Sequence, residues 1–389
     1  MLNICSGNCL TCGRCSQGAV LDSARVFARG FSPRQGYGLA IDMGTTTVVL
    51  ALISLTDGKT VARHSFLNPQ RKFGPDVISR IDAANNGHLA DMSLAIRNGI
   101  SDAVTIALSA SGLSPGNVID IAVAGNTVMA HLLLGLSCRS LGVVPFKPAH
   151  ILDESYDSRE LFTRSGLGCG VTIVPWLAGF VGGDITAGLV HVLADGKRRF
   201  VLMDIGTNGE MALCDGNRLF VTATAAGPAF EQPVRDSAGF AGASGVISAL
   251  AKLVRDGTID ETGLLEGEAV FTQKQVRELQ LAKSAIRSGL EILLQAGGLT
   301  YADLDAVYLA GGIGQAMDAR DAADIGLLPH KLSAVAVPVG NTALGGVAAL
   351  LTDPTSAAAD ISRLVSIADE INLAAHPSFN ELFMEYIAF

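Results

Sequence analysis

The sequence is poor in aromatic residues and in clustered positive charge, and both shortages narrow the range of functions. Aromatic residues make up 5% of the 389 residues, and the chain holds one tryptophan. The formal net charge is −9, and the basic residues form only short runs such as Lys197-Arg198-Arg199. Nucleic-acid-binding proteins carry a broad positive footprint, so we do not expect DNA or RNA as a partner.

Signals for membrane insertion and for secretion are also missing. The apolar stretch 171–194 contains Asp184, His191 and several glycines, so a membrane span there would bury an unpaired carboxylate. We predict a buried strand and a helix instead, and no membrane association. The N-terminus has no basic region followed by an apolar one, and cysteines begin at Cys5. We therefore expect no secretion signal and a cytoplasmic protein.

What the sequence does contain is typical of a compact α/β enzyme. Hydrophobic residues make up 49% of the chain and there are 44 glycines, which suits close packing of helices on sheets with many tight turns. The length is sufficient for two or three domains. We predict a Cys-rich segment at 1–36, one lobe at 37–198, a second lobe at 199–340, and a helical segment at 341–389 that packs back on the first lobe.

A strand, tight turn, strand pattern occurs twice, about half the chain apart. Apolar stretches at 37–41 and 47–53 flank the turn Asp42-Met43-Gly44-Thr45-Thr46, and 200–203 and 210–214 flank Asp204-Ile205-Gly206-Thr207-Asn208. Such a separation indicates two similar lobes that face each other.

Further elements complete this picture. An amphipathic stretch at 272–296 predicts a long helix that ends at Gly297-Gly298. A buried strand is predicted at 307–310, and a helix rich in small residues begins at Asn341.

Each turn has the composition of a phosphate-binding loop. An aspartate at the end of the strand can anchor Mg²⁺ through its waters, a glycine can take a positive φ, and hydroxyl and amide groups can hold phosphate oxygens. A single copy also fits an ordinary hairpin turn, but two copies, each after an apolar strand, favour ATP. The candidate ligands of ATP and Mg²⁺ are Asp42, Gly44, Thr45, Thr46, Asp204, Gly206, Thr207 and Asn208.

Residues outside the turns add to the candidate site. Gly311 and Gly312 end a strand and permit close approach of the adenine ring or ribose, although packing of a helix would also explain them. Asp184 and Glu210 are candidates for orienting the water that attacks the terminal phosphate. Either carboxylate fits equally well as a helix cap or as the partner of a surface cation.

Four cysteines within a short segment point to a metal centre. Cys5, Cys9, Cys12 and Cys15 form a C-x3-C-x2-C-x2-C run, which in a cytoplasmic chain favours a metal site over disulfides. The close spacing favours a [4Fe-4S] cluster over structural zinc, whose ligands come in two separated pairs. The first three cysteines also match radical-SAM spacing, but the lobes that follow do not predict a barrel. Isolated cysteines, as small buried hydrophobes, are expected at Cys138, Cys169 and Cys214.

Several further motifs identify a family. They are Leu67-Asn-Pro-Gln70, Gly74-Pro-Asp-Val-Ile-Ser-Arg80, Ala124-Gly-Asn-Thr-Val-Met129, Leu177-Ala-Gly-Phe-Val-Gly-Gly-Asp184, Ala226-Gly-Pro-Ala-Phe-Glu231, Arg277-Glu-Leu-Gln-Leu-Ala-Lys283, Tyr308-Leu-Ala-Gly-Gly312 and His376-Pro-Ser-Phe-Asn-Glu-Leu-Phe383. Together they make residues 37–389 resemble the ATPase region of the reductive activators of corrinoid proteins, in the acetate and sugar kinase, heat-shock chaperone and actin superfamily.

The resemblance implies two ribonuclease H-like lobes of the actin and hexokinase type with a nucleotide cleft between them, and it adds Gly227 to the nucleotide ligands. It implies an activity in which ATP helps to push an electron from an iron-sulfur centre onto a corrinoid, reducing Co(II) to Co(I). The client would be a corrinoid protein of methyl transfer, and the upstream donor a protein such as ferredoxin. ATP is needed because each 59 mV or so of unfavourable potential costs about a factor of ten in equilibrium.

Two departures from the family pattern bear on this reading. Family members usually begin with a plant-type [2Fe-2S] ferredoxin domain, whereas 36 residues precede the first predicted strand here. We expect the cysteine run to replace that domain. The segment after Glu231 is also shorter than expected, with Gly242-Ala-Ser-Gly245 in place of a longer glycine-rich stretch.

Three alternatives stay open at the level of sequence. One is an electron donor similar to the activators of 2-hydroxyacyl-CoA dehydratases. Another is a small-molecule kinase in which the cysteines are structural, and the least favoured is a chaperone-like ATPase. Whether two subunits pair is not decided by any residue.

Overall fold

The computed structural model describes residues 27, 29–149, 155–206, 208–224, 226–231, 234–236, 239–241, 243–267 and 270–389. Two compact units are present, each with its own core. The first contains the described residues from Phe27 to Asp195 together with Thr342–Ser366, and the second contains those of Gly196–Asn341 and Ile367–Phe389. The four-part division expected from the sequence stays a prediction.

The elements of the first unit are, in chain order, β1 (Tyr37–Met43), β2 (Thr47–Ser54), β3 (Thr60–Leu67), η1 (Pro69–Lys72), α3 (Val77–Ala83), η2 (Ala84–His88), α4 (Leu89–Ala110), η3 (Pro115–Asn117), β4 (Val118–Gly125), α5 (Thr127–Leu134), η4 (Arg139–Leu141), β5 (Tyr156–Asp157), α6 (Ser158–Leu161), β6 (Gly170–Ile173), α7 (Gly183–Leu193), α12 (Thr342–Thr352) and α13 (Pro354–Ile367). Its described strands form a six-stranded sheet in the order β3-β2-β1-β4-β6-β5. β1 is antiparallel to β2 and parallel to β4.

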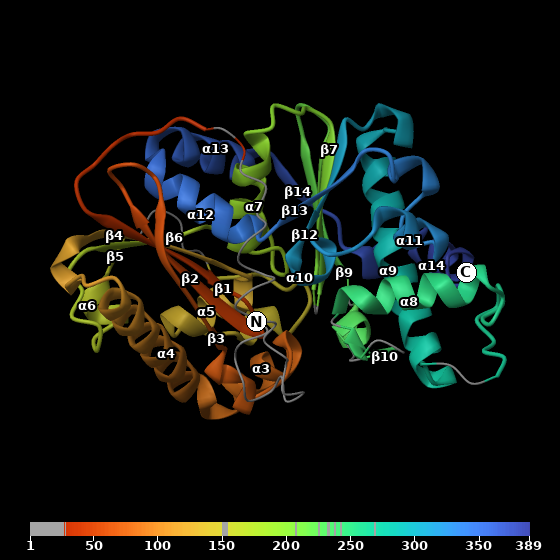
Figure 1. Ribbon diagram of the computed structural model, residues 1–389, viewed down its shortest axis with the longest axis horizontal. Helices are drawn as coiled ribbons and strands as arrows, with labels where there is room; N and C mark the ends of the chain where they lie inside the picture. The colour runs from red at the N-terminus through yellow and green to blue at the C-terminus, as the bar shows by residue number, and fades with distance from the viewer. Residues whose placement is uncertain are drawn as a thin grey trace. The chain divides into compact units, whose positions relative to one another are not determined.

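Helices cover both faces of this sheet, with α4 on one face and α12 on the other (Figure 1). Alternation along β1 produces the two layers, because Leu39 and Ile41 join the core that includes α4, whereas Ala40 joins the core that includes α12. α12 also packs tightly on α7: a β-carbon at Gly346 would lie 1.9 Å from the Ala187 carbonyl oxygen. The helix rich in small residues that was predicted after Asn341 is therefore confirmed. It packs closely on α7 because its residues at the contact are small.

Residues just before β1 are anchored to the same unit. Arg29 donates to the Val190 carbonyl in α7 and pairs with Asp360 in α13. The Ser32 amide donates to the Thr352 carbonyl over 2.8 Å. Phe27, the first described residue, lies with its ring centroid 5.2 Å from that of His191. The chain thus enters the first unit along α7 and the helices that follow residue 342.

The elements of the second unit are β7 (Phe200–Ile205), β8 (Gly209–Cys214), β9 (Leu219–Thr224), η5 (Gly227–Glu231), β10 (Val234–Asp236), β11 (Gly239–Ala241), α8 (Ala243–Arg255), α9 (Gln273–Gly297), η6 (Tyr301–Asp303), β12 (Ala306–Ala310), α10 (Gly311–Gly314), α11 (Ala319–Asp324), η7 (His330–Leu332), β13 (Ala336–Gly340), β14 (Ala368–Glu370), η8 (Leu373–Ala375) and α14 (Phe379–Glu385). Its larger described sheet has the order β13-β12-β7-β8-β9-β14.

The long helix predicted at 272–296 is confirmed as α9. Thr272 caps its start in a capping box with Gln275, and Gly298 closes it in the left-handed conformation with φ +63°. One face of α9 packs on β8 and β9 and fills the core of the second unit. The strands predicted around both turns and the helix predicted within 171–194 are likewise confirmed. The strand predicted there is β6, but only Val171 of its four residues is buried.

Side chains of α9 also hold the last residues of the chain. Gln280 Nε2 donates to the Ile387 carbonyl over 3.0 Å, and Lys283, almost fully buried, donates to the Ala388 carbonyl. The Lys283 ammonium also lies 5.1 Å from the centre of the Phe389 ring. Burial, with a smaller contribution from the Arg287 charge, lowers the pKa of Lys283 to about 8.

The two sheets share the same strand order and connectivity over five strands. The run β3-β2-β1-β4-β6 in the first unit matches β9-β8-β7-β12-β13 in the second, with the same parallel and antiparallel neighbours. In each unit a hairpin leads into a third strand, and a parallel strand then returns beside the first. The prediction of two similar α/β lobes is confirmed.

No helix among the described residues is long and apolar enough to cross a membrane.

Candidate functional site

The first turn links β1 to β2, and it is closed by a hydrogen bond from the Gly44 amide to the Thr47 carbonyl over 3.1 Å. Gly44 does not take a positive φ, contrary to the reason given for a glycine here. What requires glycine is the closeness of the returning strand, since a β-carbon at Gly44 would lie 2.6 Å from the Thr47 oxygen. Asp42 is half-buried at the end of β1, where it pairs with Ala124 of β4.

Buried donors hold the backbone of this turn from the protein interior. Asn68 Nδ2 donates to the Gly44 carbonyl over 2.9 Å, and Arg80 Nη2 donates to the Thr45 carbonyl over 2.7 Å. The Asn68 amide donates to the Thr46 carbonyl over 2.9 Å. In a trans peptide the C=O and the next N–H point in opposite directions, so the amides of Thr45 and Thr46 face away from these donors. Amides arranged in this way suit an anion.

A third buried side chain fixes the Thr45 hydroxyl. Asn126 follows β4 and caps α5, accepting a hydrogen bond from the Met129 amide over 3.0 Å, and its Nδ2 donates to Thr45 Oγ1 over 2.9 Å. Sequence reasoning assigned no role to Asn68, Arg80 or Asn126, although each lies in a motif of the family resemblance. The available signal was position, because Asn68 and Asn126 each follow a strand beside the turn.

Asp184 lies at the start of α7, which begins beside Asn126. A β-carbon at Gly182 would be 2.3 Å from the Asn126 Cα, so the turn before α7 is in close contact with the residue that holds Thr45. Asp184 is half-buried, and its Oδ1 accepts a hydrogen bond from the Ile185 amide over 2.9 Å. The structure therefore brings the start of α7 to the same end of the sheet as the first turn.

The helix that Asn126 caps, α5, contains a neutral histidine. His131 is fully buried in α5; its Nδ1 donates to the Thr127 carbonyl over 2.7 Å, and its Nε2 accepts from the Ala149 amide over 3.0 Å. This pair of contacts requires a single proton on Nδ1. Burial lowers the pKa of His131, which favours the same neutral form. The ring centroid of Trp176 lies 4.8 Å from that of His131.

The second turn links β7 to β8 in the second unit. The Gly206 amide donates to the Asn208 carbonyl over 3.0 Å, and both residues are half-buried. Thr207 lies outside the described residues. Asp204 pairs with Ala310 of the parallel strand β12 and stands opposite Glu210 of β8. Residues directly opposite in an antiparallel pair project on the same face, so the carboxylates of Asp204 and Glu210 share one face of the sheet.

The two candidate acids belong to different units. Asp184 is part of the first unit, and Glu210, which is 7% exposed, is part of the second. The choice between them as the group that orients water stays a prediction.

The glycines after β12 differ from each other. Gly311 has φ +79°, in the region that favours glycine, whereas Gly312 is exposed and an added β-carbon would meet nothing within 4 Å among the described residues. Gly227, with φ +67°, begins η5 and has similar open space. Open backbone at Gly227 and Gly312 is compatible with a ligand close to the main chain.

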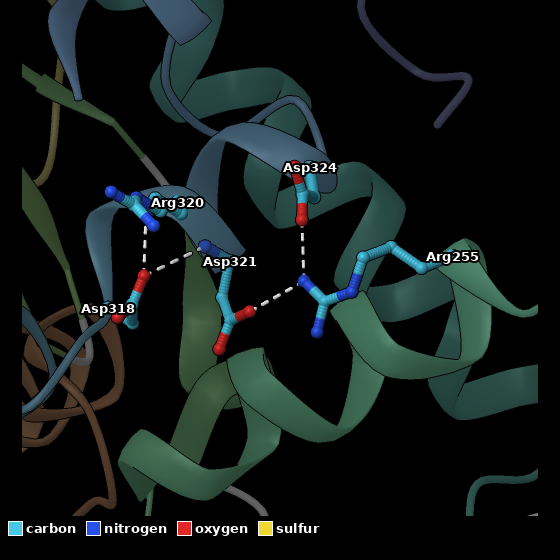
Figure 2. Close-up of polar contacts among 5 residues, drawn as sticks. All are labelled: Arg255, Asp318, Arg320, Asp321 and Asp324. Carbon is cyan, nitrogen blue, oxygen red and sulfur yellow. Dashed lines mark hydrogen bonds and ion pairs between the residues drawn. The ribbon is translucent and has the colours of Figure 1, made fainter.

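α11 follows these glycines and is held at its start and along its side. Asp318 caps it by accepting from the amides of Arg320 and Asp321, over 2.7 and 3.2 Å (Figure 2). Arg255 at the end of α8 reaches both Asp321 and Asp324 (Figure 2). These contacts tie α8 to α11.

The predicted cluster ligands Cys5, Cys9, Cys12 and Cys15 lie outside the described residues. In the part of the chain that the structure does describe, no group of three or more His, Cys, Asp or Glu side chains is placed to hold a metal ion. Cys138 and Cys214 are buried, as expected, and Cys169 is half-buried. Burial raises the pKa of Cys138 to about 11, which makes its thiol unreactive.

Two sheets with the same strand connectivity, each with an Asp-x-Gly turn at the corresponding strand end, define an ATPase fold of the acetate and sugar kinase, heat-shock chaperone and actin class. Two family models match the chain: the RACo middle region over residues 37–195, and the C-terminal, ASKHA domain of RACo over 199–236 and 261–389. Together these matches cover both turns.

Similar proteins agree with these matches. The corrinoid activation enzyme RamQ of Eubacterium limosum is 32% identical, over 90% of this chain and 69% of that protein. The [Co(II) methylated amine-specific corrinoid protein] reductase of Methanosarcina barkeri is 25% identical, over 90% of this chain and 76% of that protein. A solved structure of a reductive activator for a corrinoid, iron-sulfur protein has a TM-score of 0.79 and 28% identity, and the match covers 92% of this chain and 67% of that one. The chain belongs to the family of reductive activators of corrinoid proteins.

Proposed function

We propose that this protein uses ATP to drive one electron from a [4Fe-4S] cluster onto a corrinoid protein, reducing its cobalt from Co(II) to Co(I). The observation that carries the proposal is the match to a corrinoid activation enzyme at 32% identity over 90% of the chain. The two family models cover both turns. The alternatives of a dehydratase activator and of a small-molecule kinase have no comparable support.

The nucleotide is assigned to the two turns. The outward amides of Thr45 and Thr46 are the phosphate donors of the first turn, and Gly206, Thr207 and Asn208 are their counterparts in the second. Asp42 and Asp204 would anchor Mg²⁺ through its waters. When bound, the magnesium ion neutralises phosphate charge. Gly227, Gly311 and Gly312 leave the main chain open for the nucleoside. Asp184 or Glu210 orients the attacking water.

The electron is assigned to the N-terminal cysteines. Cys5, Cys9, Cys12 and Cys15 would hold the [4Fe-4S] cluster, which would supply one-electron chemistry, with the electron coming from a reduced donor such as ferredoxin. That electron passes to the client, where Co(II) becomes Co(I), and ATP and water become ADP and phosphate. The protein acts in the cytoplasm, as a monomer or as a homodimer.

An anaerobic assay with a corrinoid protein tests the proposal. The chain, reconstituted with iron and sulfide, is mixed with a Co(II) corrinoid protein, a low-potential reductant and MgATP, and the Co(II) and Co(I) absorbance bands are followed. We expect conversion to Co(I) that depends on both ATP and the chain. ATP hydrolysis with no change in the cobalt spectrum would overturn the proposed client, and a chain that stays colourless after reconstitution would overturn the cluster.

A further inference from the structure

Arg80 is a fully buried guanidinium whose partners are all neutral. It lies in the last turn of α3, where Nε donates to the Gly74 carbonyl over 3.0 Å, Nη1 contacts Met129 Sδ at 3.1 Å and Nη2 donates to the Thr45 carbonyl over 2.7 Å. None of the ion pairs among the described residues includes Arg80. A buried charge without an opposite charge is costly, so something other than a carboxylate must balance it.

The acidic side chain that acts on the pKa of Arg80 is engaged elsewhere. Asp76 caps α3, with Oδ1 accepting from the Ser79 amide over 2.8 Å in a reciprocal capping box. It favours the charged form of Arg80 only weakly, because burial dominates and lowers the pKa of Arg80 to about 10, with Arg71 adding to the effect. Arg80 still carries its proton at neutral pH. The positive charge is therefore permanent and faces the Thr45 peptide.

The Thr45 peptide is what connects this charge to the phosphate turn. Because the Thr45 carbonyl points to Arg80, the Thr46 amide points the other way, and a cation on the carbonyl polarises the peptide toward a stronger N–H donor. Asn68 and Asn126 hold the neighbouring groups of the same turn from the same side. The turn thus has a charged interior side and an amide-bearing outer side.

We infer that Arg80 is a positioning residue for phosphate binding, which fixes the Thr45 peptide and places a buried positive charge behind the amides that receive the nucleotide. The inference rests on the proposed function, since it names the device by which the first turn attracts the phosphates. It assigns the balancing negative charge to a bound polyphosphate. Its effect should therefore grow with the number of phosphates on the ligand.

Arg80→Gln separates the charge from the hydrogen bond, because glutamine can still donate to a carbonyl. Arg80→Lys keeps the charge and loses the three-way geometry. Arg97→Gln is the control, since Arg97 is a half-buried guanidinium in the first unit that likewise donates to a backbone carbonyl, from Nε to Leu133 over 2.8 Å. Binding of MgATP, MgADP and adenosine to the reconstituted full chain is measured by titration calorimetry, and folding is checked by circular dichroism.

For Arg80→Gln we expect MgATP affinity to fall by about ten- to a hundred-fold, the range for loss of a charged hydrogen-bond partner, with a smaller loss for MgADP and less than about two-fold for adenosine. Arg80→Lys should keep most of the unaltered chain's difference in affinity between MgATP and adenosine. Arg97→Gln should bind all three ligands as the unaltered chain does. Equal losses for ATP and adenosine, or unchanged ATP affinity in folded Arg80→Gln, would overturn the inference and leave the proposed function intact.

Two further outcomes complete the test. If Arg80→Gln does not fold, Arg80→Lys decides. A folded lysine variant that keeps the preference for ATP over adenosine would support the inference, and one that loses this preference would overturn it. If the unaltered chain binds no MgATP, the inference and the proposed function fall together.

Discussion

Gly311 lies so close to Asp204 that a β-carbon at position 311 would be 2.3 Å from Asp204 Oδ1 and 2.8 Å from the Ile205 carbonyl oxygen. The closeness follows from the parallel pairing of β12 with β7, which places Ala310 beside Asp204. The glycine that follows β12 and the aspartate that begins the second turn are thus in close contact. A side chain at one position must move the other.

We expect Gly311→Ala to lower both stability and MgATP affinity. The positive φ costs an alanine about 1–2 kcal/mol, and the collision with Asp204 adds about 1–3 kcal/mol of strain. Gly257→Ala is the matched control, because Gly257 has φ +77° but no described atom near its added β-carbon. Urea denaturation should show the larger loss for Gly311→Ala, and equal losses would mean that Asp204 moves aside at no cost.

Asp42→Asn should weaken binding of MgATP by about ten-fold or more and leave binding of ATP without magnesium within about two-fold. The reason is that the carboxylate acts on the cation, whereas the amides of Thr45 and Thr46 act on the phosphates. Titration calorimetry with and without magnesium measures both affinities. Equal weakening under the two conditions would indicate a collapse of the turn and not the loss of a cation anchor.

Replacing Cys9 with serine should abolish the visible absorbance of the reconstituted protein and the reduction of Co(II), while ATP hydrolysis continues. Serine removes one of the four thiolate ligands of the cluster, whereas ATP hydrolysis by the two units does not depend on the cluster. Cys169→Ser is the control, because Cys169 is half-buried beside Ser158 and far along the chain from the cysteine run. A Cys9→Ser protein that keeps its colour and its activity would contradict the assignment.

Lys283 predicts a rise in stability with pH. Below about pH 8 the amine is protonated in both the folded and the unfolded states, and the folded state bears the cost of a buried charge. Between about 8 and its ordinary pKa of 10.5 the folded state releases the proton while the unfolded state keeps it, so stability rises. The difference between the two pKa values corresponds to about 3 kcal/mol.

Denaturation of the unaltered chain and of Lys283→Met at pH 7, 8 and 9 measures this contribution as the difference between the two proteins. The comparison also cancels the opposite trend from Cys138, whose raised pKa lowers stability above its ordinary value of 9.0. We expect the slope to be steeper in the unaltered chain. Parallel curves would mean that the Lys283 amine exchanges freely with water in the folded state.

The cap of α11 should matter more than its ion pairs. Asp318→Ala removes the acceptor of two backbone amides and should cost about 1 kcal/mol. Arg255→Met should cost less, because 49% of the Arg255 side chain is exposed and salt screens its pairs with Asp321 and Asp324. Thermal melts at low and high salt compare the two. A larger, salt-sensitive loss for Arg255→Met would contradict this order.

The fold was largely predictable because its signals are local. Apolar runs at 37–41 and 200–203 are strands in any context that buries them, and the short turns after them allow only hairpins. The long helix α9 carried its own cap at Thr272 and its own stop at Gly298. The repeat of one wiring in the two sheets followed from the repeat of one sequence pattern.

The contacts behind the first turn were not predictable in the same way. Arg80 meets Thr45 across 35 positions of the chain, and Asn126 meets it across 81, so their roles exist only once α3 and β4 are in place. The reason offered for Gly44 was also wrong, because spacing does not reveal that the returning strand approaches to within 2.6 Å of an added β-carbon. Backbone proximity of this kind is set by the conformation of the hairpin turn, which residue spacing alone does not show.

The contact between His131 and Trp176 gives the protein an optical label of its own. Trp176 is the single tryptophan of the chain, and it belongs to the first unit, so indole fluorescence reports on that unit alone. Its neighbour sits in the helix that follows Asn126, the side chain that holds Thr45. Loss of emission during denaturation can therefore be assigned to one unit without any labelling, and compared with circular dichroism, which senses both.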